Sequence, residues 1–155
     1  MKLADFSPET VEQLSAFLPH TARTGNPVDL TFNRNPRDYV DGIPSALLSD
    51  SGVDSLFIYL LMPAHRIAQV MIQGGIAQGE AAEMARQFVI MQADAVANLV
   101  PAFGKPVVGG SFVTREDPFT RELEDRNIPM MPSPERAIKA LAALRQYARF
   151  RDALL

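Results

Sequence analysis

The sequence contains no cysteine, and this absence excludes disulfide bonds, catalytic thiolates and metal sites built on cysteine. Its two histidines, His20 and His65, have no carboxylate partners at helical spacing, so we expect no structural zinc site. No stretch approaches the roughly twenty apolar residues of a membrane span, and the first residues do not form a signal peptide. We therefore expect a cytoplasmic protein that contacts no membrane.

The chain also lacks an excess of positive charge, because its 15 lysines and arginines face 18 aspartates and glutamates. With a net charge of -3, nucleic acid is not an expected partner. Three familiar motifs are missing as well: the phosphate loop ending in Gly-Lys-Ser/Thr, the dinucleotide motif Gly-x-Gly-x-x-Gly and the nucleophile elbow Gly-x-Ser-x-Gly. The residues alone therefore show no complete catalytic constellation and no metal site.

The 155 residues are 47% apolar and 21% charged, as in one globular domain. Ser7-Pro8 is typical of a helix start, because Ser7 can cap free N–H groups and proline needs no partner at the first position. Hydrophobic spacing then predicts helices over residues 8–18, 35–49, 65–73, 80–100, 117–125 and 134–151. Strands are predicted over residues 56–61, 107–108 and 128–131, and a strand or an extended segment over residues 22–31.

This alternation requires crossover connections and predicts an α/β fold, a flavodoxin-like three-layer sandwich with a parallel sheet and helices on both faces. The unbroken apolar run at 56–61 is typical of a strand covered on both faces. Gly42 and Pro44 should kink or split the second helix. The core stripe of the last helix is predicted to be Ala137, Leu141, Leu144 and Ala148.

Ligands of open parallel sheets lie beyond the carboxyl ends of the strands, which directs attention to the loops 26–31, 62–66 and 109–114. Gly109 and Gly110 allow a close backbone approach to a phosphate, or they merely form a tight turn. Asp29 fits a general base or metal ligand as well as a turn or capping residue. We interpret His65 as an exposed loop residue rather than a catalytic one.

Five segments, in this order, carry a resemblance to a known family. They are Asn26-Pro27-Val28-Asp29-Leu30-Thr31, the apolar run at 53–61, Gly104-Lys105-Pro106-Val107-Val108, Asn127-Ile128-Pro129, and the stretch at 133–141 that begins Ser133-Pro134-Glu135-Arg136-Ala137. Together with the opening at 3–10, this ordered set resembles the second CoA-ligase domain of the ADP-forming acyl-CoA synthetases of the acetyl-CoA synthetase type, relatives of succinyl-CoA synthetase. The resemblance covers nearly the whole chain.

The resemblance implies a non-autonomous ligase domain. Enzymes of this family convert acid, CoA and ATP to acyl-CoA, ADP and phosphate, reversibly, with the phosphoryl group carried on a histidine. This domain would pack against the phosphohistidine-bearing domain and present a helix N-terminus to the phosphoryl group. The resemblance places phosphate-site candidates at Met62, Pro63, Ala64, His65, Gly109 and Gly110, and a strand-end loop at Asn26, Pro27 and Asp29. No position matches the phosphorylated histidine, and neither His20 nor His65 is assigned to it.

The same resemblance implies that residues 1–155 are one domain excised from a longer polypeptide, or else a separate subunit. CoA, ATP or ADP, and magnesium would bind elsewhere in the full-length protein, on a CoA-binding domain, a first CoA-ligase domain and an ATP-grasp module. The isolated chain should be inactive. Its expected partners are those other domains or subunits.

The chain departs from the family in two places. Met62-Pro63-Ala64-His65 stands where succinyl-CoA synthetase has a glycine-rich segment, and the crossover between Pro63 and Gly104 is unusually long. The extra residues form either a partner surface or a decoration. Two alternative functions therefore stay open: a regulatory or scaffold domain of an acyl-CoA synthetase-like protein lysine acetyltransferase, and an interaction module that keeps only the fold.

Overall fold

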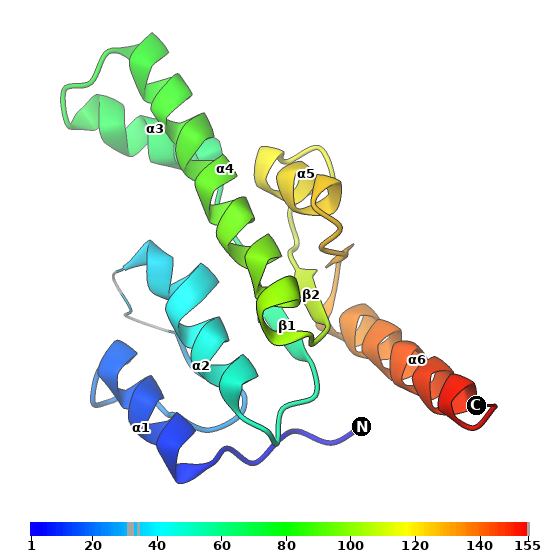
Figure 1. Cartoon of the computed structure of the whole chain (residues 1–155). Helices are drawn as coiled ribbons and strands as arrows, with labels where there is room; N and C mark the ends of the chain where they lie inside the picture. The colour runs from blue at the N-terminus through cyan, green and yellow to red at the C-terminus, as the bar shows by residue number, and fades with distance from the viewer. Residues whose placement is uncertain (31–32, 34, 155) are drawn as a thin grey trace.

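The computed structural model describes residues 1–30, 33 and 35–154, in which a parallel sheet lies between two layers of helices (Figure 1). Its strands are β1 (Leu56–Tyr59), β2 (Val107–Gly110) and β3 (Met130–Met131), in this spatial order. Both pairings are parallel, as the crossover helices require. The predicted α/β class, a flavodoxin-like sandwich, is confirmed.

One face of the sheet carries α1 (Pro8–Phe17), α2 (Ile43–Ser49), α4 (Gln78–Phe103) and α5 (Pro118–Asp125). These helices bury the main core against the sheet. Among the described residues, α6 (Pro134–Asp152) alone covers the other face. The large side chains that are almost fully buried all belong to the first layer and the sheet side it covers: Leu14, Val40, Leu48, Val89, Val96, Phe119, Leu123 and Ile128.

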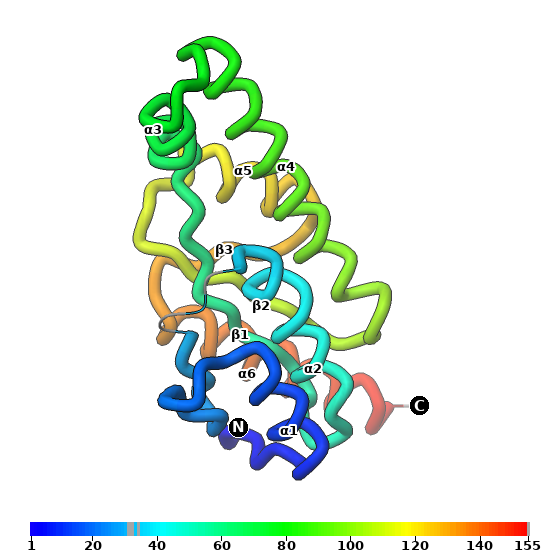
Figure 2. The backbone as a smooth tube through the Cα atoms, turned by 90° about the vertical axis from the view of Figure 1, so that its left-hand side faces the viewer, coloured from blue at the N-terminus to red at the C-terminus, as the bar shows by residue number. Residues whose placement is uncertain are grey.

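The long crossover is a helical hairpin of α3 (Ala64–Gln73) and the start of α4, and it projects beyond the sheet (Figures 1 and 2). Gly75, with a φ of 96°, makes the turn between the two helices, because left-handed backbone is easiest for glycine. No residue of α3 is fully buried. Among the described residues, no helix combines the length and the apolar character that crossing a membrane would need.

The predicted break in the second helix is confirmed. A π-helical turn, η1 (Asp38–Gly42), precedes α2. Gly42 has a packing reason: a Cβ at this position would come within 2.7 Å of the Phe17 ring of α1. The absence of a side chain at Gly42 therefore lets α1 approach this segment closely.

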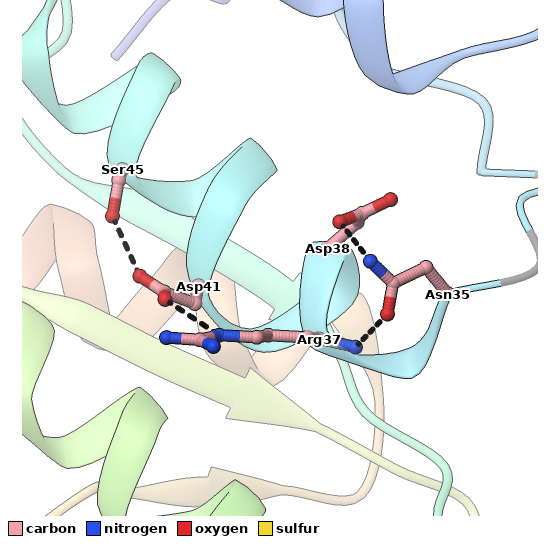
Figure 3. A network of polar contacts seen from close by, with 5 residues as sticks. All are labelled: Asn35, Arg37, Asp38, Asp41 and Ser45. Atoms are coloured by element: carbon pink, nitrogen blue, oxygen red, sulfur yellow. Dashed lines mark hydrogen bonds and ion pairs between the residues drawn. The ribbon is translucent and has the colours of Figure 1, made fainter.

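Polar side chains hold the beginning of this helical segment (Figure 3). Asn35 Oδ1 accepts from the Arg37 backbone N–H, and Asn35 Nδ2 donates to Asp38 Oδ1 at 2.7 Å. Asp41 accepts from Arg37 Nε at 3.4 Å and from the Ser45 hydroxyl at 3.3 Å. The ion pair is largely exposed, so the network fixes local geometry rather than adding much stability.

The segment at 22–31 is an extended loop in its described part, and no strand is found within residues 22–30. The strand alternative for this segment is therefore wrong over those residues; Thr31 lies outside the described residues. The cause is local competition: Val28 and Leu30 pack against the core, while the Leu30 carbonyl accepts from the Tyr39 hydroxyl at 3.0 Å. These contacts hold the segment away from β1.

Two predictions of burial are also wrong. Tyr59 at the end of β1 is 41% exposed and Leu61 is 45% exposed, although coverage on both faces was predicted. Leu144 of α6 is 47% exposed, and Ala148 is only half-buried. The reason is shared, because a single helix covers this face and its second half extends past the sheet (Figure 1). Ala137 and Leu141 are buried as predicted.

The Asp50 carboxylate links the start of α1 to the turn before β1. It accepts from the backbone N–H of Ser7 and from that of Gly52, each at 2.8 Å. These hydrogen bonds favour the charged form, that of Ser7 most, and lower the pKa of Asp50 to about 2. A long-range contact thus depends on one ionised side chain.

We expect this contact to make the domain sensitive to acid. Since the pKa of Asp50 is lower in the folded chain than the ordinary 3.8, its contribution is complete above about pH 4 and is lost as the pH falls toward 2. In thermal denaturation followed by circular dichroism, Asp50→Asn should lower Tm at pH 7 and flatten the decline of Tm in acid. Asp54→Asn, at a nearby exposed position, is the control. Parallel curves for the wild type and Asp50→Asn would contradict the prediction.

Candidate functional site

Three helices begin at the carboxyl edge of the sheet, where ligands of parallel sheets bind. β1 leads into α3, β2 leads into α5 and β3 leads into α6. The first N–H groups of a helix have no partner within the helix and carry the positive end of its dipole. Which of the three can accept an external anion depends on how each N-terminus is capped.

The N-termini of α5 and α6 are occupied by their own side chains. Asp117 Oδ2 accepts from the backbone N–H groups of Phe119 at 3.1 Å and Thr120 at 3.2 Å. Ser133 Oγ accepts from the Arg136 N–H at 3.4 Å. The Asp117 carboxylate also places a negative charge at the start of α5, which opposes the binding of a second anion there.

The start of α3 is different. Pro63 precedes the helix and provides no capping side chain, and the first turn holds no acidic residue. The Pro63 carbonyl accepts from the backbone N–H groups of Arg66 at 3.0 Å and Ile67 at 3.3 Å. Ala64 and His65 are the residues whose N–H groups begin the helix, and His65 and Arg66 are exposed. This N-terminus is therefore positive and uncapped, while Met62, Pro63 and Ala64 are half-buried beneath it.

Gly109 and Gly110 are explained by packing inside β2. A Cβ on Gly109 would overlap the Met130 sulfur, and one on Gly110 would lie 2.6 Å from the Phe57 ring. The Gly109 N–H donates to the Pro129 carbonyl at 2.9 Å, and the Gly110 carbonyl accepts from the Leu60 N–H at 2.8 Å. These two backbone groups serve the sheet.

The structure separates the other candidate residues from the start of α3. Asn26, Pro27 and Asp29 line a cavity of about 1020 Å³ along β1, and its lining includes none of residues 62–65, 109 or 110. Asn26 Nδ2 donates to the Ala4 carbonyl at 3.2 Å, which ties this loop to the N-terminal segment. Because no strand leads into it within residues 22–30, it is not a strand-end loop in the described part of the chain.

Sequence reasoning missed an aromatic pair at the carboxyl edge. The rings of Tyr59 and Phe112 have centroids 5.4 Å apart and planes inclined by 41°. Phe112 is 73% exposed. The next residues of this loop are charged: Arg115 pairs with Glu124 at 2.8 Å, and a hydrogen bond from Thr114 lowers the pKa of Glu116. The pair stands out in the structure because Phe112 is exposed. The sequence shows that these residues are apolar, but it does not show whether they are exposed.

Among the described residues, no group of three or more histidine, aspartate or glutamate side chains could hold a metal ion. The carboxyl edge thus combines an uncapped helix start with exposed aromatic side chains. The carboxyl edge of this fold is therefore compatible with a bound anion, but its described residues do not form a complete catalytic centre.

Comparison with known proteins identifies the class as a CoA-ligase-type domain. No family model matches the chain. The alpha subunit of ADP-forming acetate–CoA ligase II from Pyrococcus furiosus is 31% identical over 150 residues, which cover 96% of the chain and 29% of that subunit. The crystal structure of PH0766 from Pyrococcus horikoshii OT3 matches with a TM-score of 0.61 and 26% identity, over 87% of this chain and 27% of that one.

The chain is thus homologous to a part of an ADP-forming acetate–CoA ligase alpha subunit, and the family resemblance predicted from its sequence is confirmed. It spans less than a third of the length of both proteins. The similarity therefore concerns a part of each of these two proteins and not their full length.

Proposed function

We propose that this chain serves as one domain of an ADP-forming acyl-CoA ligase, where it packs against the phosphohistidine-bearing domain and helps to form the phosphoryl site. One observation carries the proposal: of the three helices at the carboxyl edge, α3 alone begins without a side-chain cap. Homology to a ligase subunit supplies the reaction class.

In this proposal the start of α3 faces the phosphoryl group during its transfer. The N–H groups of Ala64 and His65, together with the helix dipole, stabilise the negative charge without any change in protonation. Arg66 adds a positive charge from the same turn. No side chain of this domain forms a covalent intermediate, so its role is electrostatic, and the isolated chain is inactive.

CoA, the adenine nucleotide and magnesium bind to other domains or subunits in this proposal. The described residues provide no acidic cluster for a metal, and the sequence contains no nucleotide-binding motif. The domain contributes orientation and charge stabilisation at the interface where its companion presents the phosphohistidine.

The test uses the assembled ligase, made of this chain with the domains or subunits that complete it. ATP formation from acyl-CoA, ADP and phosphate is measured for the wild type and for Ala64→Asp. A carboxylate at the start of α3 stabilises the helix itself but repels the phosphoryl group. We expect the rate at low phosphate concentration to fall by at least about tenfold, the effect of roughly 1.4 kcal/mol.

Gln69→Asp is the matched control, because it adds the same charge at an exposed position further along α3. It should stay within about twofold of the wild type, since dipole effects fade beyond the first turn. Equal activity of Ala64→Asp and the wild type would refute the role of α3. Turnover by the isolated 155-residue chain would refute its dependence on partners.

An interaction module is the second candidate function, and the packing of Gly109 and Gly110 favours it. If Gly109 and Gly110 only allow close packing within the sheet, the start of α3 is, among the described residues, the one remaining part of a phosphate site at this edge. Flanking sequence separates the remaining possibilities, because a ligase requires an ATP-grasp module and a lysine acetyltransferase requires an acetyltransferase domain. Failure of the full assembly to form ATP would favour the interaction module.

A further inference from the structure

β1 is an edge strand with hydrogen-bonding groups directed away from the sheet. Its Leu56 and Leu60 N–H groups donate to the carbonyls of Pro106 and Gly110. In a parallel strand the bonding direction alternates, so the N–H and C=O groups of Phe57 and Tyr59 point to the open side. Among residues 1–30, 33 and 35–154, no segment is hydrogen-bonded to these groups on that side. Unpaired edges of this kind are templates for another strand.

The cavity of about 1020 Å³ lies along this same edge. Residues from both helical layers line it, and Figure 1 shows α2 and α6 on opposite sides of β1. Its lining from the first layer includes Tyr39, Ile43 and Leu47, and its lining from α6 includes Leu141, Leu144 and Ala148. β1, residues 26–30 and the N-terminal segment (residues 1–4 and 6) form the remaining walls. We call this space the edge slot.

The edge slot has the surroundings of an inner strand: apolar side chains above and below, with backbone donors and acceptors beside it. A strand placed there would direct alternate side chains toward α2 and toward α6. The charged side chains in the lining are Lys2, Asp29, Asp54 and Arg145, two of each sign. A matching occupant is therefore apolar on both faces and carries no net charge.

We propose that the edge slot binds an extended apolar segment of a partner protein, which adds a fourth strand to the sheet by pairing with Phe57 and Tyr59 of β1. Strand addition of this kind obtains affinity from main-chain hydrogen bonds and specificity from pockets for alternate side chains. Residues 26–30 line the same cavity as β1, so they lie where the rest of a second sheet would have to approach. A partner segment thus fits better than a second copy of this chain.

This binding does not depend on the proposed ligase role. The edge slot is lined by the whole of β1 and by Pro106 before β2, and its lining includes none of residues 62–65, where the phosphoryl site is assigned. If the start of α3 has no phosphoryl role, the edge slot is unchanged, and if the edge slot binds no strand, the start of α3 is unchanged.

The probe is a fluorescein-labelled peptide of sequence Lys-Thr-Val-Ile-Val-Thr-Glu, acetylated and amidated, with binding to the 155-residue chain followed by fluorescence anisotropy. The same peptide N-methylated at alternate residues is its control, because methylation removes strand donors but keeps the apolar side chains. The protein variant is Tyr59→Pro, which removes one outward N–H; proline is tolerated there because that N–H does not pair with β2. Tyr59→Val loses the same side chain but keeps the N–H.

We expect saturable binding that weakens at least tenfold on N-methylation and in Tyr59→Pro, and that stays within threefold of the wild type in Tyr59→Val. Amide hydrogen exchange gives a second readout: the N–H groups of Phe57 and Tyr59 should exchange rapidly in the free chain and slowly in the complex.

Equal affinity of the methylated peptide, or an absence of binding, overturns the proposal. Protection already present in the dilute free chain would mean that its own loop fills the slot, and protection that grows with protein concentration would mean a second copy. Either result also overturns it.

Discussion

Replacement of Phe119 by alanine is expected to lower the free energy of unfolding by about 3–5 kcal/mol. Phe119 is the largest side chain among those almost fully buried, with 1% of its surface exposed, and it anchors α5 in the main core. Its removal loses apolar burial and leaves a cavity that close-packed neighbours cannot fill. Since the free energy of unfolding of such domains is about 5–15 kcal/mol, this loss is a large part of their stability.

Urea denaturation measures the effect, and Phe112→Ala is the matched control. Phe112 is 73% exposed and contacts the Tyr59 ring, so its removal should change stability by about 0.5 kcal/mol or less. A similar loss for both variants would mean that α5 is not packed in the core as described.

Replacement of Gly109 by alanine is expected to lower the free energy of unfolding by about 1–3 kcal/mol, the usual cost of overpacking. The added Cβ would overlap the Met130 sulfur and lie 3.3 Å from Leu60 Cδ1. Gly109 sits in the central strand, paired to β3 opposite Met130, and the overlapping atoms belong to the flexible Met130 side chain. Relief therefore requires the Met130 side chain to leave its position against β2, and the penalty is the loss of that packing.

Gly79→Ala provides the control in the opposite direction. Gly79 lies in α4 with no atom near its added Cβ, so alanine should raise stability by about 0.5–1 kcal/mol. The comparison also decides between the two interpretations of the glycines at 109 and 110. If Gly109→Ala leaves stability unchanged but abolishes ATP formation in the assembled ligase, the glycines serve phosphate approach, and the packing explanation is wrong.

Local signals in the sequence predicted the regular elements well. Ser7, Asp117 and Ser133 are each followed by proline, and all three cap the helices that the pattern predicts there. Gly104, at a φ of 63°, ends α4 as a left-handed residue. The helix nevertheless runs to Phe103, beyond the predicted end, although Pro101 in its last turn has no N–H to donate to the Ala97 carbonyl.

The candidate site could be predicted only in part. The run Met62-Pro63-Ala64-His65 locates the start of α3, since the end of a strand and the missing capping residue are both visible in the sequence. The structure showed that α5 and α6 are capped while α3 is not. It also showed that Asn26, Pro27 and Asp29 belong to a different cavity, which depends on distant packing.

By itself, the sequence determined the order and type of most helices and strands and the parallel sheet, and its ordered motifs carried the family resemblance. The helices and strands follow from short-range signals, namely caps, turn residues and hydrophobic period, which act within a few residues. Only the tertiary structure decided which apolar residues are covered. Tyr59, Leu61 and Leu144 look like core residues in the chain and stay exposed, because α6 is the one helix of the described residues that packs on their side of the sheet. The open edge of β1 has the same origin: whether residues 22–30 pair with it depends on competing contacts of Val28 and Leu30 with the core, and on the hydrogen bond from Tyr39 to Leu30.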